Sequence, residues 1–421
     1  MTDAHWRTIR LVDLAADVRW SLNGGPFGSK LTTKHYTASG VPVIRGANLS
    51  GSGRFSMDDF VFVSEAKADE LRPNNAFPGD IVFTQRGTIG QVGLIPHDSP
   101  YPRFVISQSQ MKLTPDAAKV DAEFLYFLFR APRTVKKLTD LAFAAGVPHI
   151  NLDILRRFEI SIPTLSVQRR IAAILSDYED LIANNVRRIQ ILEKMAASIY
   201  REWFVHFRFP GHEAVAMVES LLGPIPEGWM IRSLGECCVL TMGQSPPSRT
   251  YNTIGEGLPF HQGVRDFGPR FPLTRLYCTQ DGRQADARDI LFSVRAPVGR
   301  MNFADRRIVI GRGLCAIRAI DGSQAFLWEQ LRNRFTEEDM IGNGAIFAAV
   351  TKTEMERLSL LWPAKELLAH AATLLEPLHE LVRVLFEEVE GLRVTRDLLL
   401  PRLMSGRLTL PHAERLASAT L

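Results

Sequence analysis

The sequence predicts an α+β protein in which two similar globular domains alternate with two long helices that pair as an antiparallel coiled coil. Three observations lead to this architecture: the length of 421 residues, an internal repeat, and two long apolar stripes at heptad spacing. A chain of this length exceeds one ordinary domain. Its hydrophobic content of 46% is sufficient for more than one buried core.

The internal repeat is clearest between residues 79–90, GDIVFTQRGTIG, and residues 288–299, RDILFSVRAPVG. Each copy predicts a buried strand that runs into a tight loop presenting an arginine. Further matches follow in the same order along the chain, so we interpret the sequence as a duplication. The matching positions are Asp80/Asp289, Ile81/Ile290, Phe83/Phe292, Arg86/Arg295, Gly90/Gly299, Trp6/Trp229, Leu11/Leu234, residues 124–126 with 326–328, and residues 149–163 with 349–363.

A helical segment follows the proline that ends each copy, Pro163 and Pro363. Apolar residues at heptad spacing predict two long helices that can pack together. Asn185 occupies one of these positions, where it either fixes the helix register or marks a solvated kink. Pro377 is expected to kink or break the second helix near its start. The stripe residues are Ile171, Tyr178, Asn185, Leu192 and Ile199 in the first helix, and Leu378, Leu385, Leu392 and Leu399 in the second.

These patterns divide the chain into five segments. They are a first globular domain at 1–163, a central helical spacer at 164–205, a second globular domain at 206–363 with an N-terminal linker at 206–228, a C-terminal helical spacer at 364–410, and a tail at 411–421.

Several function classes lack their usual residues. There is no long apolar run for a membrane span and no secretory pattern at the N-terminus, so we expect a cytoplasmic protein. The four cysteines form no C-x-x-C pair, which argues against a zinc site or a disulfide framework. Neither a phosphate-binding loop nor a cluster of metal-binding carboxylates is present. Ser245-Pro246-Pro247 lacks the following aromatic residue with which DNA amino-methyltransferases stack a flipped base. We therefore expect no catalytic residue, no metal site and no enzymatic activity.

Arginines recur in the glycine- and proline-rich turns of both copies. On loops, their planar guanidinium groups suit bidentate contacts with phosphates or with guanine edges. The net charge of +4 permits nucleic-acid binding without requiring it. These arginines are Arg45, Arg54, Arg72, Arg86 and Arg103 in the first copy, and Arg249, Arg265, Arg270, Arg295 and Arg312 in the second.

Several stretches along nearly the whole chain resemble the specificity subunits of type I restriction–modification systems. They are GPFGSKLTTKHYTASGVPVIRGANL (25–49), GDIVFTQRGTIG (79–90), ISIPTLSVQRRIAAIL (160–175), REWFVHFRFPG (201–211), GPIPEGW (223–229) and LLPRLMSGRLTL (399–410). The resemblance implies that each globular domain is a target-recognition domain that reads one half of a split DNA site in the major groove. It also implies that the paired helices set the gap between the half-sites and dock two methyltransferase subunits, which motor-nuclease subunits join. S-adenosylmethionine, ATP and Mg²⁺ are then expected on these partners and no cofactor on this chain.

The loops of the two domains diverge outside the repeat, so the two half-sites are expected to differ and the full site to be asymmetric. Polar residues on these loops are the candidates for DNA contact, because Ser, Lys and Arg suit phosphates or guanine while Asn and Gln suit adenine. The candidates are Ser29, Lys30, Arg45, Asn48, Gln85, Arg86 and Thr88 in the first domain, and Gln244, Ser245, Arg249, Gln262, Arg265, Arg295 and Arg312 in the second. Turn formation or capping is the alternative role for each, and a buried ion pair is the alternative for Arg86 and Arg295.

Three other functions fit the pattern less well, and one of them, a pure protein-interaction scaffold, would leave the loop arginines without a role. A self-sufficient DNA methyltransferase or nuclease lacks its motifs here. A free-standing DNA-binding regulator, built on the same duplicated fold, would need no enzymatic partner.

Overall fold

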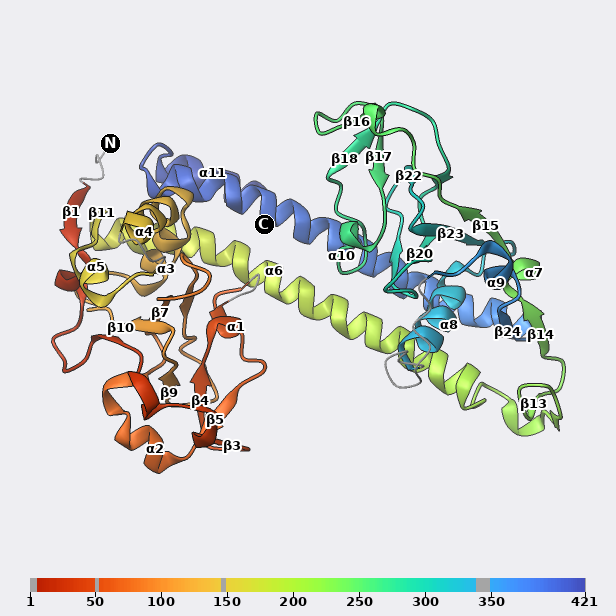
Figure 1. The fold of residues 1–421 in the computed structure, drawn as a ribbon, viewed down its shortest axis with the longest axis horizontal. Coiled ribbons are helices and arrows are strands. Elements are labelled where there is room, and N and C mark those ends of the chain that lie inside the picture. The colour runs from red at the N-terminus through yellow and green to blue at the C-terminus, as the bar shows by residue number, and fades with distance from the viewer. Residues whose placement is uncertain (1–5, 50–52, 145–148, 338–348, 421) are drawn as a thin grey trace. The chain divides into compact units, whose positions relative to one another are not determined.

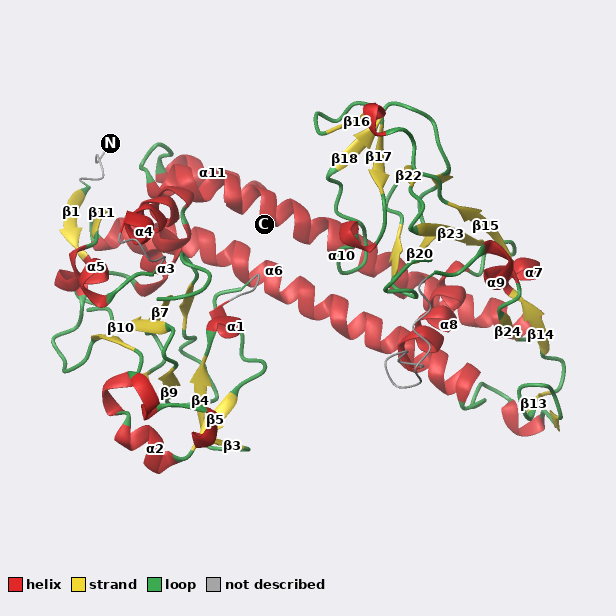
Figure 2. Ribbon diagram, viewed as in Figure 1, coloured by secondary structure: helices red, strands yellow, loops and turns green. Residues whose placement is uncertain are grey.

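The computed structural model describes residues 6–49, 53–144, 149–337 and 349–420. The chain forms two compact units, one made of residues 1–187 and 385–421 and the other of residues 188–384. Each unit combines small β-sheets with short helices and with segments of the long helices (Figure 1; Figure 2). The boundaries between these units fall inside both long helices and not at the expected domain limits. They therefore do not test those limits, which remain a prediction.

Unit 1, residues 1–187 and 385–421, contains a four-stranded sheet, a five-stranded sheet and a strand pair. All strand pairs are antiparallel except β4 with β9. The four-stranded sheet has the order β2 (Leu22–Gly24), β10 (Gln110–Leu113), β7 (Ile81–Thr84), β8 (Val92–Leu94). The five-stranded sheet has the order β3 (Tyr36–Thr37), β5 (Val61–Val63), β4 (Val41–Ile44), β9 (Phe104–Ile106), β6 (Asn75–Ala76). The strand pair is β1 (Arg7–Arg10) with β11 (Glu159–Ile162), and the helices are α1 (Gly46–Leu49), α2 (Glu65–Glu70), α3 (Ala122–Arg130), α4 (Pro132–Ala144) and α5 (Leu152–Arg157).

Unit 2, residues 188–384, repeats this plan strand for strand. Its parallel strand pair, β17 with β22, takes the place of β4 with β9. The four-stranded sheet has the order β15 (Cys238–Met242), β23 (Leu314–Ala319), β20 (Ile290–Ser293), β21 (Met301–Phe303). The five-stranded sheet has the order β16 (Tyr251–Asn252), β18 (Leu276–Cys278), β17 (Leu258–His261), β22 (Ile308–Ile310), β19 (Gln284–Ala285). The strand pair is β14 (Met230–Ser233) with β24 (Ser359–Trp362), the helices are α7 (Leu234–Cys237), α8 (Gln324–Glu337) and α9 (Lys352–Glu356), and a short hairpin of β12 (Met217–Val218) and β13 (Ile225–Pro226) precedes them.

The duplication predicted from the sequence is therefore confirmed. The repeated aspartates also have equivalent structural roles, because each closes the turn before the central strand of its four-stranded sheet. Asp80 accepts a hydrogen bond from the backbone N–H of Phe77 at 3.0 Å, and Asp289 accepts one from Asp286 at 2.8 Å. Burial raises the pKa of Asp80, although the Lys112 ammonium lies 3.3 Å away. The repeat thus preserves a buried turn.

The two long helices are α6 (Leu165–Tyr200) and α10 (Lys365–Met404). In unit 1 the Glu179 carboxylate of α6 lies 2.9 Å from the Arg396 guanidinium of α10. In unit 2 the Trp203 ring, just beyond α6, lies 5.1 Å from the His370 ring of α10. One helix advances along the sequence while the other recedes, so they are antiparallel, as predicted. Of the predicted stripe, Ile171, Tyr178, Asn185, Leu385, Leu392 and Leu399 are buried, and Leu192, Ile199 and Leu378 are half-buried.

Two local expectations for these helices need correction. Of the kink or break expected at Pro377, the break is wrong, because α10 runs through this position without interruption, and the kink stays a prediction. Pro377 is exposed, so water can solvate the carbonyl group that its missing N–H leaves unbonded. The solvated kink considered for Asn185 is also wrong, because this side chain is fully buried. Beyond α10, the segment expected as a tail contains the helix α11 (Leu410–Thr420).

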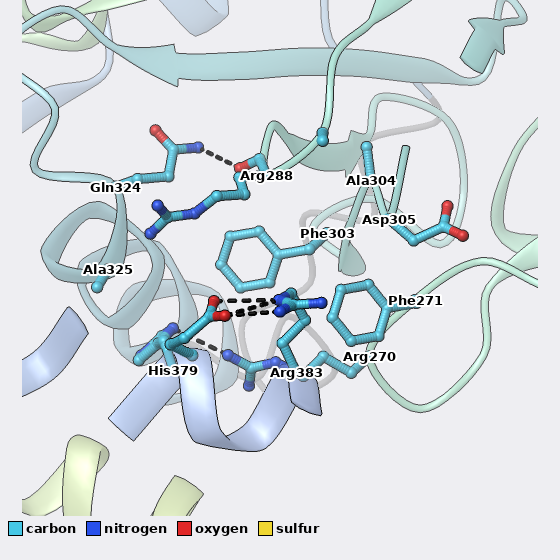
Figure 3. Close-up of a pocket in the computed structure, with 12 residues that line it drawn as sticks. Arg270, Phe271, Arg288, Phe303, Ala304, Asp305, Gln324, Ala325, His379 and Arg383 are labelled. Atoms are coloured by element: carbon cyan, nitrogen blue, oxygen red, sulfur yellow. Dashed lines mark hydrogen bonds and ion pairs between the residues drawn. The ribbon is translucent and has the colours of Figure 1, made fainter. Parts of the chain in front are cut away.

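A buried polar network lies in unit 2 beside a pocket of about 240 Å³ (Figure 3). The Arg270 guanidinium donates to Glu193 of α6 at 2.8 Å and to Nδ1 of His379 of α10 at 2.9 Å. On the other side of the imidazole, Nε2 of His379 lies 3.0 Å from the Glu329 carboxylate of α8. Because arginine has no acceptor, Nδ1 must be unprotonated, and the ring is neutral with its proton on Nε2. The network therefore requires an uncharged His379.

This requirement predicts a pH-dependent stability for unit 2. Burial lowers the pKa of His379 below its usual 6.5, even though Glu329 and Glu376 oppose the shift. The unfolded chain then binds more protons near and below pH 6.5. The contribution of neutral His379 to the free energy of unfolding is therefore fully present above that pH and is lost as the pH falls. We expect the His379→Gln variant to lose less stability between pH 7.5 and 5.5, because an amide fills the same donor and acceptor roles without titrating. Urea unfolding at both pH values measures the difference, and equal losses in both proteins would contradict the assignment.

Candidate nucleic-acid interface

The structure brings most of the predicted site residues together on one surface of each unit. In unit 1 four loops meet, and we call residues 25–31, 45–46, 85–88 and 107–109 loop face 1. The backbone N–H of Ser107 donates to the Ile44 carbonyl at 3.0 Å, and that of Gln85 donates to the Ser109 carbonyl at 2.7 Å. The segment between β9 and β10 therefore holds the loops that follow β4 and β7.

Loop face 2 is built in the same way from residues 243–249, 262–265, 294–296 and 311–313. The backbone N–H of Gly311 donates to the His261 carbonyl at 2.8 Å, and that of Val294 donates to the Gly313 carbonyl at 3.0 Å. These bonds join the same strand ends as their counterparts in unit 1, namely the ends of β17 and β20. The two faces are therefore structurally equivalent.

Close backbone crossings fix the first loop of each face. A Cβ atom on Gly25 would lie 2.0 Å from the carbonyl oxygen of Ser107, and one on Gly243 would lie 2.1 Å from that of Gly311. Only glycine fits at either position, since neither neighbour is a flexible side chain.

We therefore predict that Gly243→Ala destabilises the chain by about 1–3 kcal/mol, because the loops must separate to admit the methyl group. Gly391→Ala in α10 is the matched control, since nothing lies within 4 Å of its added Cβ. That variant is expected to gain about 0.5–1 kcal/mol from higher helix propensity. Urea unfolding of both variants gives the two signs, and a stable Gly243→Ala protein would contradict the crossing.

Loop face 2 gathers the predicted polar residues into a hydrogen-bonded cluster. The Ser245 hydroxyl accepts from the side-chain amide of Gln262 at 2.9 Å and from the backbone N–H of Arg312 at 3.2 Å. Gln244, Arg249 and Arg265 are exposed on the same loops. Neighbouring donors and cations on rigid backbone are the groups that suit phosphate and base-edge contacts.

Loop face 1 places Ser29, Lys30, Arg86 and Thr88 in exposed positions. Gln85 and Arg45 are half-buried, and the Arg45 guanidinium donates to the Asp59 carbonyl. Arg86 and Arg295 are both exposed, so the buried ion pair considered for them is wrong.

Asn48 requires a correction, because its side chain is fully buried. Its amide oxygen accepts from the backbone N–H of Arg45 at 2.9 Å, and its amide nitrogen donates to the Asp58 carbonyl at 2.9 Å. These bonds brace the loop that follows β4. Asn48 therefore supports loop face 1 from below and presents no group to a ligand.

Three of the loop arginines are not available for DNA contact as expected, because they form ion pairs with carboxylates of the protein. Arg103 bonds to Asp69 at 2.7 Å and to Glu65, both in α2. Arg54 bonds to Asp180 and Arg270 bonds to Glu193, and both carboxylates lie in the long helix that contains residues 165–200. A turn arginine that holds the fold and one that faces solvent look the same in sequence, since both occur among glycines and prolines.

Sequence reasoning missed two residues of loop face 1. Gln108 donates from its amide to the carbonyls of Gly28 at 2.6 Å and Leu31 at 2.8 Å, and so holds the η2 turn (Gly28–Lys30). Phe27, which precedes that turn, is 80% exposed. The repeat offered a weak signal for Gln108, because Ile106 before it matches Ile310 before Arg312. Phe27 gave none, because an apolar residue in a loop is usually assigned to the core.

The described residues contain no group of three or more His, Cys, Asp or Glu side chains placed to hold a metal ion. Within the same described ranges, no helix has the length and apolar character needed to cross a membrane. All four cysteines are buried and free.

Comparison with known proteins gives one family. Residues 6–194 match the profile described as "Type I restriction modification DNA specificity domain". Two proteins of Methanocaldococcus jannaschii are similar over most of the chain. The MjaX type I restriction enzyme specificity subunit is 28% identical, and the match covers 96% of this chain and 93% of the MjaX chain. The MjaIX specificity subunit is 24% identical, with coverages of 89% and 88%.

The fold agrees with that of a solved structure. The S subunit of a type I restriction–modification system from M. genitalium is 18% identical, with a TM-score of 0.64 and coverages of 96% and 97%. Fold and loop faces together describe a duplicated protein whose two units present equivalent polar surfaces. Over most of its length the chain is therefore similar to type I restriction–modification specificity subunits, and residues 6–194 match their DNA specificity domain.

Proposed function

We propose that this chain is the DNA-reading subunit of a type I restriction–modification complex, and that each loop face reads one half of a bipartite site. The observation that carries the proposal is the repeated loop face, with exposed Arg86 and Arg295 at equivalent positions. A cationic, hydrogen-bonding surface on rigid loops attracts phosphates and can discriminate base edges. Two equivalent faces in one chain fit a split target.

The two half-sites should differ in sequence. Loop face 1 carries the additional η2 turn with Phe27 and Lys30, whereas loop face 2 carries Ser245 bonded to Gln262 and Arg312. These groups favour different base edges. The Phe27 ring suits a thymine methyl group, and the Gln262 amide suits adenine. We therefore propose an asymmetric target.

Catalysis is assigned to partner subunits in this proposal. Two methyltransferase subunits would carry S-adenosylmethionine, motor-nuclease subunits would carry ATP and Mg²⁺, and the long helices would dock them. The half-buried apolar residues of the stripe, such as Leu192 and Leu378, are suited to such packing. The free, buried cysteines fit a reducing cytoplasm, where we place the complex.

The proposal is tested by co-expressing the full chain with its neighbouring methyltransferase subunit and mapping methylated adenines across the genome. We expect one split motif with a constant gap that is methylated only when this chain is present. Methylation that is independent of the chain, or no stable complex with the partner, would contradict the proposal. DNA binding without such a complex would support a free-standing regulator instead.

A further inference from the structure

Each unit inserts one loop arginine between its sheets and the long helices. Arg54 does this in unit 1 and Arg270 in unit 2. The backbone N–H of Leu94, which ends β8, donates to the Arg54 carbonyl at 3.1 Å. The backbone N–H of Phe303, which ends β21, donates to the Arg270 carbonyl at 2.8 Å. Because β8 and β21 are equivalent strands, the two arginines occupy equivalent positions.

Arg270 is held from several directions. Only 3% of the residue is exposed, and its guanidinium bonds to Glu193 of α6 and to His379 of α10, as described above. It also lies over the rings of Phe303 at 5.1 Å and Trp328 at 5.2 Å, which stack on each other (Figure 3 shows Arg270 beside Phe303 and His379). A planar group with directional bonds and two aromatic neighbours has one favourable pose.

Arg54 makes the corresponding connection in unit 1. Its guanidinium bonds to Asp180 of α6 and lies 3.4 Å from the Glu123 carboxylate of α3. Glu123 also accepts a hydrogen bond from the Ser176 hydroxyl of α6. The carboxylate partners differ from those of Arg270, but the connection is again from a loop to a long helix.

The same loops carry residues of the loop faces. In unit 2 the Asp266 carboxylate accepts from the backbone N–H of Gln262 at 3.0 Å, and the Asp266 carbonyl accepts from the N–H of Leu273 at 2.7 Å. The Asn302 side chain bonds to both backbone groups of Gly268, at 3.1 and 3.0 Å. The loop is therefore braced from Gln262 to Arg270, so a displacement of Arg270 moves loop face 2.

We propose that Arg54 and Arg270 are positioning residues that fix each loop face on the long helices of its own unit, and that this pose limits the gap allowed between the two half-sites. The inference rests on the proposed DNA-reading function. Well-packed apolar residues often stabilise a fold as much as buried ion pairs do. The directional bonds of Arg270 instead restrict orientation, which is the property that a fixed gap requires.

The test uses the full chain with the methyltransferase subunit and the same methylation map. Arg270→Met removes the bonds to Glu193 and His379 while keeping an apolar side chain against Phe303. We expect the ratio of methylation at gaps one base pair longer or shorter to methylation at the native gap to rise about tenfold, the equivalent of 1.4 kcal/mol. The bases of both half-sites should not change, because the loop faces stay intact. Arg54→Met should act in the same way.

Two further variants keep the result interpretable. Arg383→Met is the matched control, because Arg383 lines the same pocket but pairs with Glu380 on its own helix, and it should leave the gap ratio unchanged. Glu193→Gln keeps Arg270 and weakens only its bond to α6, so it should widen the gap tolerance less than Arg270→Met does. If Arg270→Met fails to accumulate, Glu193→Gln still tests the inference. An even loss of methylation at all gaps in Glu193→Gln and Arg270→Met would overturn the inference. Absence of any split motif with the wild-type chain would instead overturn the proposed function.

Discussion

Replacing Glu179 with alanine is expected to lower the free energy of unfolding by about 3–5 kcal/mol. Glu179 lies in α6 and is 3% exposed. Its carboxylate accepts from the Arg130 guanidinium of α3 at 2.8 Å and from the Arg396 guanidinium of α10 at 2.9 Å. Alanine would remove the carboxylate that the two arginines share and leave their guanidinium groups facing each other where water has little access, which is the source of the large cost.

Each arginine keeps one other partner: Arg396 bonds to the mostly exposed carboxylate of Asp397 at 2.9 Å. The Tyr126 hydroxyl accepts from Arg130 at 2.6 Å, but burial raises the pKa of Tyr126 to about 12, so it remains a neutral partner. Urea unfolding of the full chain, followed by circular dichroism, measures the loss. Glu179→Gln keeps an acceptor without its charge and should fall between alanine and the wild type.

Asp140→Ala is the matched control, because Asp140 forms an exposed ion pair with Lys136 at 2.7 Å. Removing an exposed pair of this kind costs about 0.3–0.5 kcal/mol. A Glu179→Ala protein that resembles this control would show that Arg130 and Arg396 do not depend on Glu179. Adding Arg396→Met to Glu179→Ala should recover part of the stability, because it removes one of the two cations that repel each other without Glu179.

The large features of the fold could be predicted because they are written as patterns along the chain. The repeat around Asp80 and Asp289 gave the equivalent strands, and the heptad stripes gave both long helices. The strand order could not be predicted, because non-neighbouring strands such as β4 and β9 pair through tertiary packing that no local pattern records. The break expected at Pro377 was wrong for a related reason. Tertiary packing outweighs the loss of one hydrogen bond in an otherwise stable helix.

The candidate site was predicted at the level of loops and less well at the level of side chains. Arg86 and Arg270 lie in similar turns, yet the first is exposed and the second is buried on the helices. The difference depends on which carboxylate lies nearby in space, and Glu193 is far from Arg270 in sequence. Asn48 was misassigned because its amide serves a backbone loop, a role that asparagine fills as readily as a contact with adenine.

Replacing Arg295 with alanine is expected to weaken binding to the cognate site by about 1–3 kcal/mol, or about 10–100-fold in Kd, and to relax one base position of one half-site. Arg295 is exposed at the end of β20, and its backbone pairs with Ala349, so the side chain starts from a fixed point. Arg86→Ala should relax the equivalent position of the other half-site. Fluorescence anisotropy with duplexes carrying single base changes measures both effects.

A uniform loss across all duplexes would mean that these arginines contact only phosphates, because phosphate contacts carry no direct sequence information. In that case the slope of log Kd against log salt should decrease by about one for each arginine removed. Arg7→Ala on β1 and Arg232→Ala on β14 remove the same charge from exposed strand positions outside the loop faces. If these controls weaken binding as much as Arg86→Ala and Arg295→Ala do, the net charge drives binding and the loop faces do not read DNA. If only the loop-face variants act, each in its own half-site, the duplicated structure has two independent reading surfaces.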